Sequence, residues 1–207
     1  MEETNSGAGS SNVLEFIAVA DQYCKHLTRA RGYKPSEFLF VMQRVLPLLY
    51  LKTVNLPRFE PFFEEGNERF VREDEYNAIE QSVSAMLGSS DSFEEPYDYT
   101  MHADGEPVAG SISEYLADIY QDVKDCILQY RTGTEEVMND AIWECSLNFE
   151  TIWGARLLSV MRAIHRVLYS GQEIVGNDMK VDEGSQVSDP DRSSWFISRR
   201  QQEYGEE

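Results

Sequence analysis

Two charged residues in the last long apolar pattern of the chain are the strongest candidates for chemistry. Glu150 and Arg156 both fall within about 60° of the centre of the apolar face that a helix over 135–169 would have. Burying an unpaired charge costs several kcal/mol, so a charge on such a face needs a partner. We therefore expect each residue to be paired, through polar groups of the helix predicted at 36–54 or of that predicted at 111–130. A paired charge that fixes helix register is favoured over a ligand site.

An interhelical pocket is the alternative role for this region. Arg156 could hold an anionic group through two parallel hydrogen bonds, and aromatic side chains could line the pocket beside it. Aromatic residues at helical spacing belong more often to a core. The candidate ligand-binding residues are Tyr50, Asp118, Trp143, Glu150, Trp153 and Arg156.

A row of carboxylates on the predicted helix at 111–130 has the spacing to hold a divalent cation. Glu114, Asp118, Asp122 and Asp125 lie three or four residues apart, so their oxygens could be adjacent. They lie opposite the apolar stripe, however, and carboxylate metal sites in bundles face the core and usually add a Glu-x-x-His element. The sequence has no such element. We interpret the row as a solvated helix face and expect no metal site and no cofactor.

The sequence offers no catalytic residue. It has neither a phosphate-binding glycine motif nor a G-x-S-x-G nucleophile elbow. The three histidines, His26, His102 and His165, are isolated from one another and from other ligands at metal-binding spacing. The sequence therefore favours a protein that is not an enzyme.

The charge of the chain limits its partners. Its 37 acids against 18 bases give a formal net charge of -19. Nucleic acids and anionic membranes attract Lys and Arg clusters, so we expect neither as a partner. Residues 73–108 carry ten acids and no Lys or Arg. Solubility is the simplest role for this charge.

The acidic segment also suggests a binding role. Aromatic residues between the acids could supply contact area while the charge attracts a basic protein partner. The leading functional hypothesis is therefore a non-enzymatic protein-interaction module, and a homodimer whose role is assembly is left open. The candidate partner-binding residues are Phe93, Glu94, Glu95, Tyr97, Asp98 and Tyr99.

The cysteines and the hydropathy pattern favour a cytoplasmic protein. Cys24, Cys126 and Cys145 are odd in number and widely spaced, so we expect reduced, mostly buried thiols rather than disulfides or a zinc site. No stretch has the roughly 18–20 consecutive apolar residues that a membrane helix needs. Residues 1–11 lack the features of a signal peptide.

Apolar residues at helical spacing predict an all-α helical bundle of about five helices. The expected helices begin at Asn12 and cover about 12–27, 36–54, 73–87, 111–130 and 135–169. The second has only Gln43 and Arg44 as polar residues between Phe38 and Leu51, so we expect it at the centre of the bundle, with a kink at Pro47. The last is long for the domain, and we expect a bend near Gly154.

The remaining segments are polar. We expect a disordered tail at 1–11, a single helical domain at 12–169 and a mostly flexible acidic tail at 170–207. The stretch 89–108 has no regular period and is predicted to be an extended loop.

Three stretches together resemble the bacterial family called domain of unknown function (DUF) 5063. They are Leu46–Tyr50 (LPLLY), Gly110–Lys124 (GSISEYLADIYQDVK) and Phe149–Arg156 (FETIWGAR), the last leading to Ala163–His165. The resemblance spans about Phe16–His165 and implies a small helical cytosolic protein, without an activity, a ligand or a catalytic residue. In that family His often flanks the Trp-Gly pair, whereas this chain has Ile152 and Arg156 there. A metal or acid–base role of those histidines is therefore not expected here.

Overall fold

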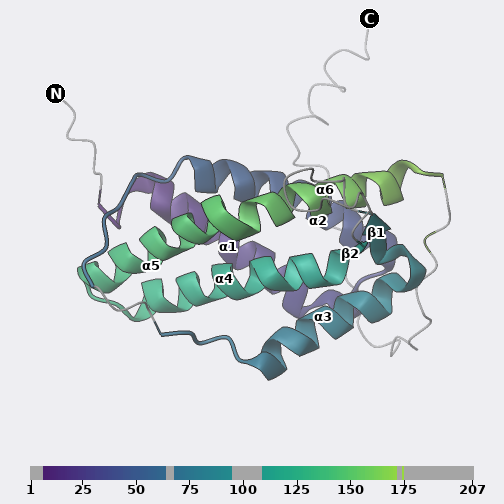
Figure 1. Cartoon of the computed structure of the whole chain (residues 1–207), viewed down its shortest axis with the longest axis horizontal. Coiled ribbons are helices and arrows are strands. Elements are labelled where there is room, and N and C mark those ends of the chain that lie inside the picture. Colours follow the sequence, from purple (N-terminus) through teal and green to yellow (C-terminus); the bar gives the residue numbers. More distant parts are fainter. Residues whose placement is uncertain (1–6, 64–67, 95–108, 172–173, 175–207) are drawn as a thin grey trace, which may run out of the picture.

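Helices that run along a common long axis make up the domain (Figure 1). The structure, a computed structural model, describes residues 7–63, 68–94, 109–171 and 174. An all-α helical bundle is therefore confirmed. Its helices are α1 (Ser11–Thr28), α2 (Pro35–Val54), α3 (Glu73–Leu87), α4 (Ile112–Thr132), α5 (Glu135–Asn148) and α6 (Gly154–Tyr169), with short 3-10 turns at Ala30–Gly32 and Gly88–Ser90.

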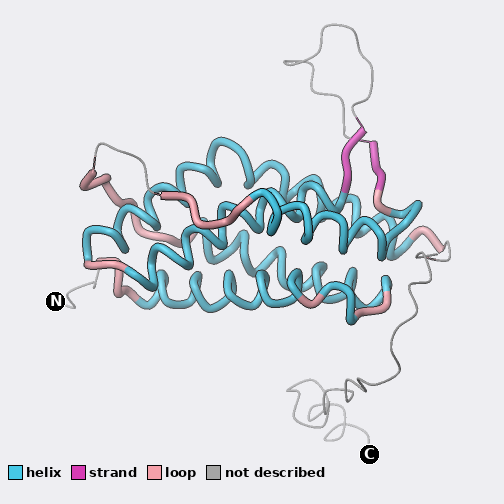
Figure 2. Tube along the Cα trace, turned by 90° about the horizontal axis from the view of Figure 1, so that it is seen from below, coloured by secondary structure: helices cyan, strands magenta, loops and turns pink. Residues whose placement is uncertain are grey.

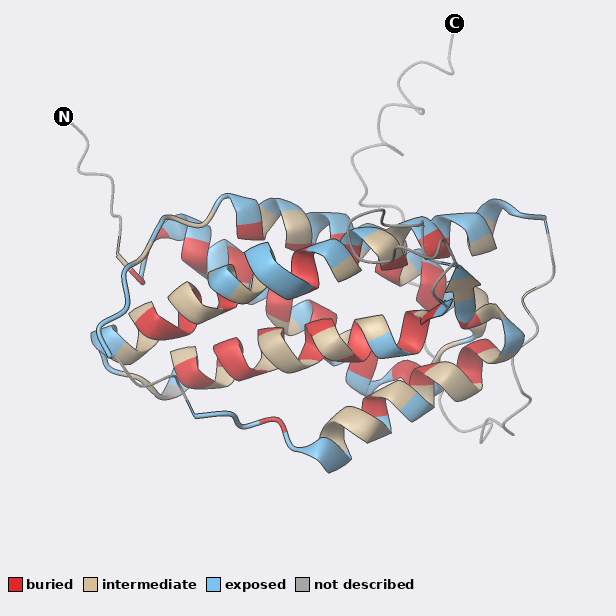
Figure 3. Ribbon diagram, viewed as in Figure 1, coloured by how far each residue is buried: buried red, intermediate tan, exposed pale blue. Residues whose placement is uncertain are grey.

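Helix α4 occupies the centre of the bundle. It packs against α1, α3, α5 and α6, whereas α2 packs mainly against α1 and α6. Along α4 buried residues predominate, and Glu114 is exposed in its first turn (Figure 3). The buried apolar residues of α4 are Ile112, Leu116, Ala117, Ile119, Tyr120, Val123, Cys126 and Ile127.

The expectation that the second helix is central is wrong. Four large apolar side chains of α2, Phe40, Leu48, Leu51 and Val54, are between 42% and 50% exposed. An apolar composition on all sides permits burial but does not require it, because exposed apolar residues are common on protein surfaces. Pro47 lies within α2 without ending it, and the kink there stays a prediction.

The last helix changes type where the sequence predicts a bend. Residues Phe149–Trp153 form a π-helical turn between α5 and α6. Gly154 follows directly, and a Cβ atom on it would lie 2.5 Å from the carbonyl oxygen of Phe149. A side chain at Gly154 would therefore collide with the backbone of the π-helical turn.

A short hairpin stands out from the helices at one end of the bundle (Figure 2). Strands β1 (Ser92–Glu94) and β2 (Ala109–Ser111) pair antiparallel, with Phe93 opposite Gly110. The prediction of an irregular loop over 89–108 is therefore wrong for its first residues. A three-residue strand is too short for its period to be visible, and residues 95–108 lie outside the described part of the chain.

Asp91 connects the hairpin to α4. Its carboxylate accepts the amide of Ser113 at 2.8 Å and the hydroxyls of Ser113 and Ser111 at 2.7 Å and 3.0 Å. Asp91 is 7% exposed. This acid of the 73–108 segment is thus part of the structure at the start of α4 and is not presented to a partner.

The predicted tails lie mostly outside the described residues. Of them, the structure describes 7–11, 170–171 and 174. Ala8 is buried, and its carbonyl oxygen accepts the hydroxyl of Tyr130 at 2.8 Å. Among the described helices, none combines the length and the apolar character that crossing a membrane requires.

Candidate functional site

The Arg156 guanidinium is bonded within the bundle. It forms an ion pair with the Asp118 carboxylate on α4, and it lies over the Tyr115 ring at 5.6 Å from the ring centroid. The hydroxyl of Tyr76 on α3 donates to the other Asp118 oxygen at 3.0 Å. Groups from α3, α4 and α6 therefore satisfy one another, and the predicted pairing of Arg156 with the 111–130 helix is confirmed.

Glu150 does not join this cluster. Its side chain is exposed in the π-helical turn, and no described residue pairs with it. The expectation that Glu150 lies near the apolar face and is paired is wrong, because it requires an uninterrupted α-helix over 135–169. Hydrogen bonds from i to i+5 wind extra residues into each turn, so Glu150 is rotated relative to the face that α6 predicts, whereas Trp153, directly before Gly154, stays buried.

The predicted pocket aromatics are core residues. Trp153 is fully buried, and its indole N–H donates to the carbonyl of Cys145 at 3.2 Å. Its ring lies 4.7 Å from that of Phe149, which meets Tyr50 edge-on at 5.2 Å. Trp143 on α5 is half-buried. Neither of the two cavities described below includes any of the six predicted ligand-binding residues.

The carboxylate row on α4 is largely buried. Asp125 is 5% exposed, and one of its oxygens accepts the amides of Phe70 and Val71, both at 2.8 Å. Asp122 accepts the side-chain amide of Asn148 at 3.1 Å. The interpretation as a solvated face is therefore wrong beyond Glu114. Residues 68–72, which precede α3, cover this face of α4 and supply backbone donors that no helical wheel shows.

A second carboxylate also binds the segment that connects α2 to α3. Asp140 on α5 accepts the amide of Phe62 at 2.8 Å and that of Phe63 at 2.9 Å. Burial raises the pKa of Asp140, but these donors and Asn139 outweigh it, so its pKa is lowered. For Asp122 and Asp125 burial prevails, and their pKa values are raised although Arg69 lies near both.

A small cavity adjoins this acidic face. It has a volume of about 10 Å³ and is lined by Asp122, Asp125 and Glu144, among others. One Asp125 oxygen has no hydrogen-bond partner in the described part of the chain. The space suits about one water molecule. Within the described ranges no three His, Cys, Asp or Glu residues are arranged to hold a metal ion.

The cysteines are free and buried, as the sequence predicts. Burial raises the pKa of Cys24. A hydrogen bond with Cys126, together with burial, raises the pKa of Cys145. Protonated thiols are poor nucleophiles, so the Cys24 and Cys145 side chains are structural.

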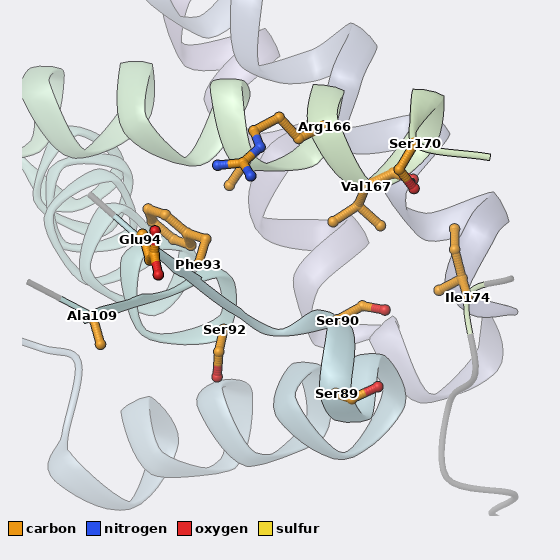
Figure 4. A pocket seen from close by; sticks show the side chains of 11 residues that line it. Ser89, Ser90, Ser92, Phe93, Glu94, Ala109, Arg166, Val167, Ser170 and Ile174 are labelled. Carbon is orange, nitrogen blue, oxygen red and sulfur yellow. The ribbon is translucent and has the colours of Figure 1, made fainter. Parts of the chain in front are cut away.

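A wide opening lies at the hairpin end of the bundle. A groove of about 600 Å³ is bounded by the 3-10 turn Gly88–Ser90, by the two strands and by the C-terminal half of α6. In Figure 4, Arg166 and Val167 project from α6 toward the groove, Phe93 and Glu94 lie on the strand opposite, and Ile174 stands at the other end. Its size is within the range of about 300–1,000 Å³ that is typical of ligand sites.

Two of the predicted partner-binding residues lie at this groove. Phe93 is half-buried, and its ring meets Tyr115 edge-on at 5.4 Å. Glu94 is exposed, and its carbonyl oxygen accepts Arg162 at 3.0 Å. The other four, Glu95, Tyr97, Asp98 and Tyr99, lie outside the described residues.

Sequence reasoning missed Arg166, although a signal was present. Residues 154–169 contain Arg156, Arg162, His165 and Arg166 but no acid, in a chain with 37 acids. Such a reversal of charge along one helix indicates a surface with its own role.

The comparisons with known proteins agree with this architecture. The profile of the family described as "Domain of unknown function (DUF5063)" matches residues 8–170. The chain belongs to this family. The DUF5063 match thus includes every helix from α1 to α6.

A solved structure shares the DUF5063 fold of this chain. The crystal structure of protein BF1032 from Bacteroides fragilis is 38% identical and covers 80% of this chain and 97% of its own, with a TM-score of 0.69. The comparison with the curated proteins finds no match. Two stretches that carry the family resemblance, 110–124 and 149–156, contain Asp118, Arg156 and the π-helical turn.

Proposed function

We propose that this DUF5063 domain is a non-enzymatic protein-interaction module that contacts a basic partner protein through an acidic surface. One contrast carries the proposal. The charged groups that the sequence offered for chemistry, Asp118 and Arg156, are bonded to each other, whereas Glu73 and Asp74 on α3 and Glu94 on the hairpin are exposed. Exposed like charges attract an oppositely charged partner over a distance and speed its association.

Part of the acidic segment serves the fold, which narrows the binding surface. Asp91 bonds to the start of α4, and Glu75 accepts the hydroxyl of Tyr120 at 2.6 Å. The acids left for a partner are therefore Glu73, Asp74, Glu80 and Glu94. The sequence adds Glu95 and Asp98, with Tyr97 and Tyr99 between and beside them, to the proposed surface.

The alternative of a small-ligand binder or enzyme near Glu150 and Arg156 has less support. The Arg156 guanidinium, which would hold the anion, is already paired with Asp118 and lies over the Tyr115 ring. Glu150 points to solvent. We further propose that the module acts in the cytoplasm, which the three free, buried thiols support.

A pull-down with matched charge variants tests the proposal. The bait is the full chain, offered a lysate of the source organism at low and at high salt. The test variant combines Glu73→Gln, Asp74→Asn and Glu80→Gln on α3. The control combines Glu60→Gln, Glu135→Gln and Glu136→Gln, which neutralises as many exposed charges outside α3.

We expect a basic partner that the wild type and the control retain at low salt. The α3 variant should lose it, and high salt should release it, because exposed charge pairs are screened by salt. Partners retained equally by both variants, or no partner released by salt, would contradict the proposal.

A further inference from the structure

Strand β1 has one edge that β2 does not use. The amide of Ile112 donates to the carbonyl of Asp91 at 2.8 Å, so these residues form a hydrogen-bonded pair. Such pairs alternate along an antiparallel ladder. The next one is therefore Phe93 with Gly110, and the backbone N–H and C=O groups of Ser92 and Glu94 point away from β2. Arg162 of α6 meets the Glu94 carbonyl on this side.

The groove lies between this free edge and α6. Ser92 and Glu94 line it on the strand side, and Arg166 and Val167 line it on the helix side (Figure 4). Its apolar lining includes Phe93, whose ring is fixed against Tyr115. An extended chain lying here would meet the outward backbone groups of Ser92 and the N–H of Glu94 on one side and side chains of a helix on the other. Among the described residues no partner is seen for these backbone groups, whereas the Glu94 carbonyl accepts Arg162.

The helix side of the groove is positively charged. Arg166 is exposed, and no described residue forms an ion pair with it. Its neighbour one turn earlier, Arg162, donates to a neutral carbonyl oxygen. A carboxylate on the bound segment is the group that an unpaired guanidinium binds best, through two parallel hydrogen bonds.

We propose that the groove binds an extended segment of a partner protein by strand addition to β1. The segment pairs its backbone with Glu94 and Ser92, inserts an apolar side chain between Phe93 and Val167, and sets a carboxylate against Arg166. This mode uses main-chain hydrogen bonds for affinity and side-chain contacts for specificity. The groove shares Glu94 with the proposed acidic surface, but it uses the backbone of that residue and the positive charge of α6 rather than the α3 acids. This proposal therefore goes beyond the proposed function.

A selection from a displayed library of random 12-residue peptides tests the proposal, with the full chain as the target. The two informative variants at one position are Glu94→Pro and Glu94→Gln. Proline removes the outward N–H of an edge strand and leaves the carbonyl that Arg162 binds, whereas glutamine keeps both. Arg166→Gln tests the charge, and Arg44→Gln on the exposed side of α2 is its control.

We expect enriched peptides that alternate apolar and polar residues and carry an acid. Glu94→Pro should weaken their binding by about fivefold, because the one backbone hydrogen bond that is lost is worth about 1 kcal/mol. Arg166→Gln should weaken it by about tenfold. Glu94→Gln and Arg44→Gln should bind as the wild type does. An unchanged unfolding midpoint for each variant shows that the fold is intact.

Three results would overturn the proposal. The first is a selection that enriches no peptide. Peptides that bind Glu94→Pro as tightly as Glu94→Gln are held by side chains alone, as a small ligand would be. A wild-type dimer that Glu94→Pro converts to a monomer would show that a second copy fills the groove. None of these outcomes depends on the three α3 acids, so failure here is distinguishable from failure of the proposed function.

Discussion

Arg156 on α6 and Asp118 on α4 form an ion pair that joins the last helix to the central one. Asp118 is 17% exposed and Arg156 39% in their side chains, so the pair lies at the margin of the core. Tyr76 donates to the same carboxylate from α3. Three helices are thus fixed relative to one another by polar groups that are already satisfied.

The contribution of Asp140 to stability should be greater at neutral pH than at acidic pH. We expect Asp140→Ala to lower the free energy of unfolding by about 2 kcal/mol, because two backbone amides lose a charged acceptor. The pKa of Asp140 is lowered from 3.8 in the folded state, so its contribution is present above 3.8 and is lost as the pH falls through the folded pKa. Urea denaturation of wild type and variant from neutral to acidic pH measures this difference. Glu135→Ala on the same helix is the control, and a difference independent of pH would contradict the assignment.

Asp122 should show the opposite pH dependence. Burial raises its pKa above 3.8, so its contribution is greatest below 3.8 and is lost as the pH rises through the folded pKa. We expect Asp122→Asn to be more stable than the wild type at neutral pH by about 0.5–1 kcal/mol, since an amide oxygen still accepts from Asn148 without a buried charge. The gain should shrink as the pH falls toward 3.8. The same denaturation series measures it, and a variant less stable than wild type at neutral pH refutes the expectation.

Gly154 should not tolerate a side chain. We expect Gly154→Ala to cost about 1–3 kcal/mol, because the new Cβ atom meets the Phe149 carbonyl and the backbone must shift. Gly32→Ala is the matched control, since no atom lies within 4 Å of its Cβ position. It should change stability by less than about 1 kcal/mol. Thermal unfolding compares the two, and equal midpoints would mean that the π-helical turn does not require glycine.

The sequence predicts the helices because their apolar residues repeat at helical spacing. It identifies the apolar stripe of α4, and it predicts correctly that Arg156 is paired with another helix. It does not show which helix is central, since α2 is more apolar than α4 but leaves Leu48 and Leu51 exposed. Helix α4 can lie at the centre of the bundle because polar groups from other segments bind its carboxylates.

Those partners are the part of the site that the sequence could not reveal. The amides of Phe70 and Val71 meet Asp125 across more than fifty residues of chain. Backbone donors have no sequence signature, so a helical wheel assigns such an acid to solvent. Glu150 was misplaced for a related reason, because the π-helical turn changes the rotation per residue.

The groove was also beyond the sequence prediction. Three-residue strands carry no detectable period, so neither β1 nor its free edge could be inferred. The basic character of residues 154–169 was visible, and it identifies the side of the groove that Arg166 occupies.

A double-mutant cycle on Asp118 and Arg156 tests most directly whether the charges in the bundle serve the fold while binding takes place elsewhere. We expect Asp118→Asn and Arg156→Met each to lower the free energy of unfolding by about 1–2 kcal/mol, and the double variant to fall short of their sum by about 1 kcal/mol. Binding of any identified partner should be unchanged in the folded variants. Single variants that leave stability intact, show no coupling and abolish binding would instead identify Arg156 as a ligand site.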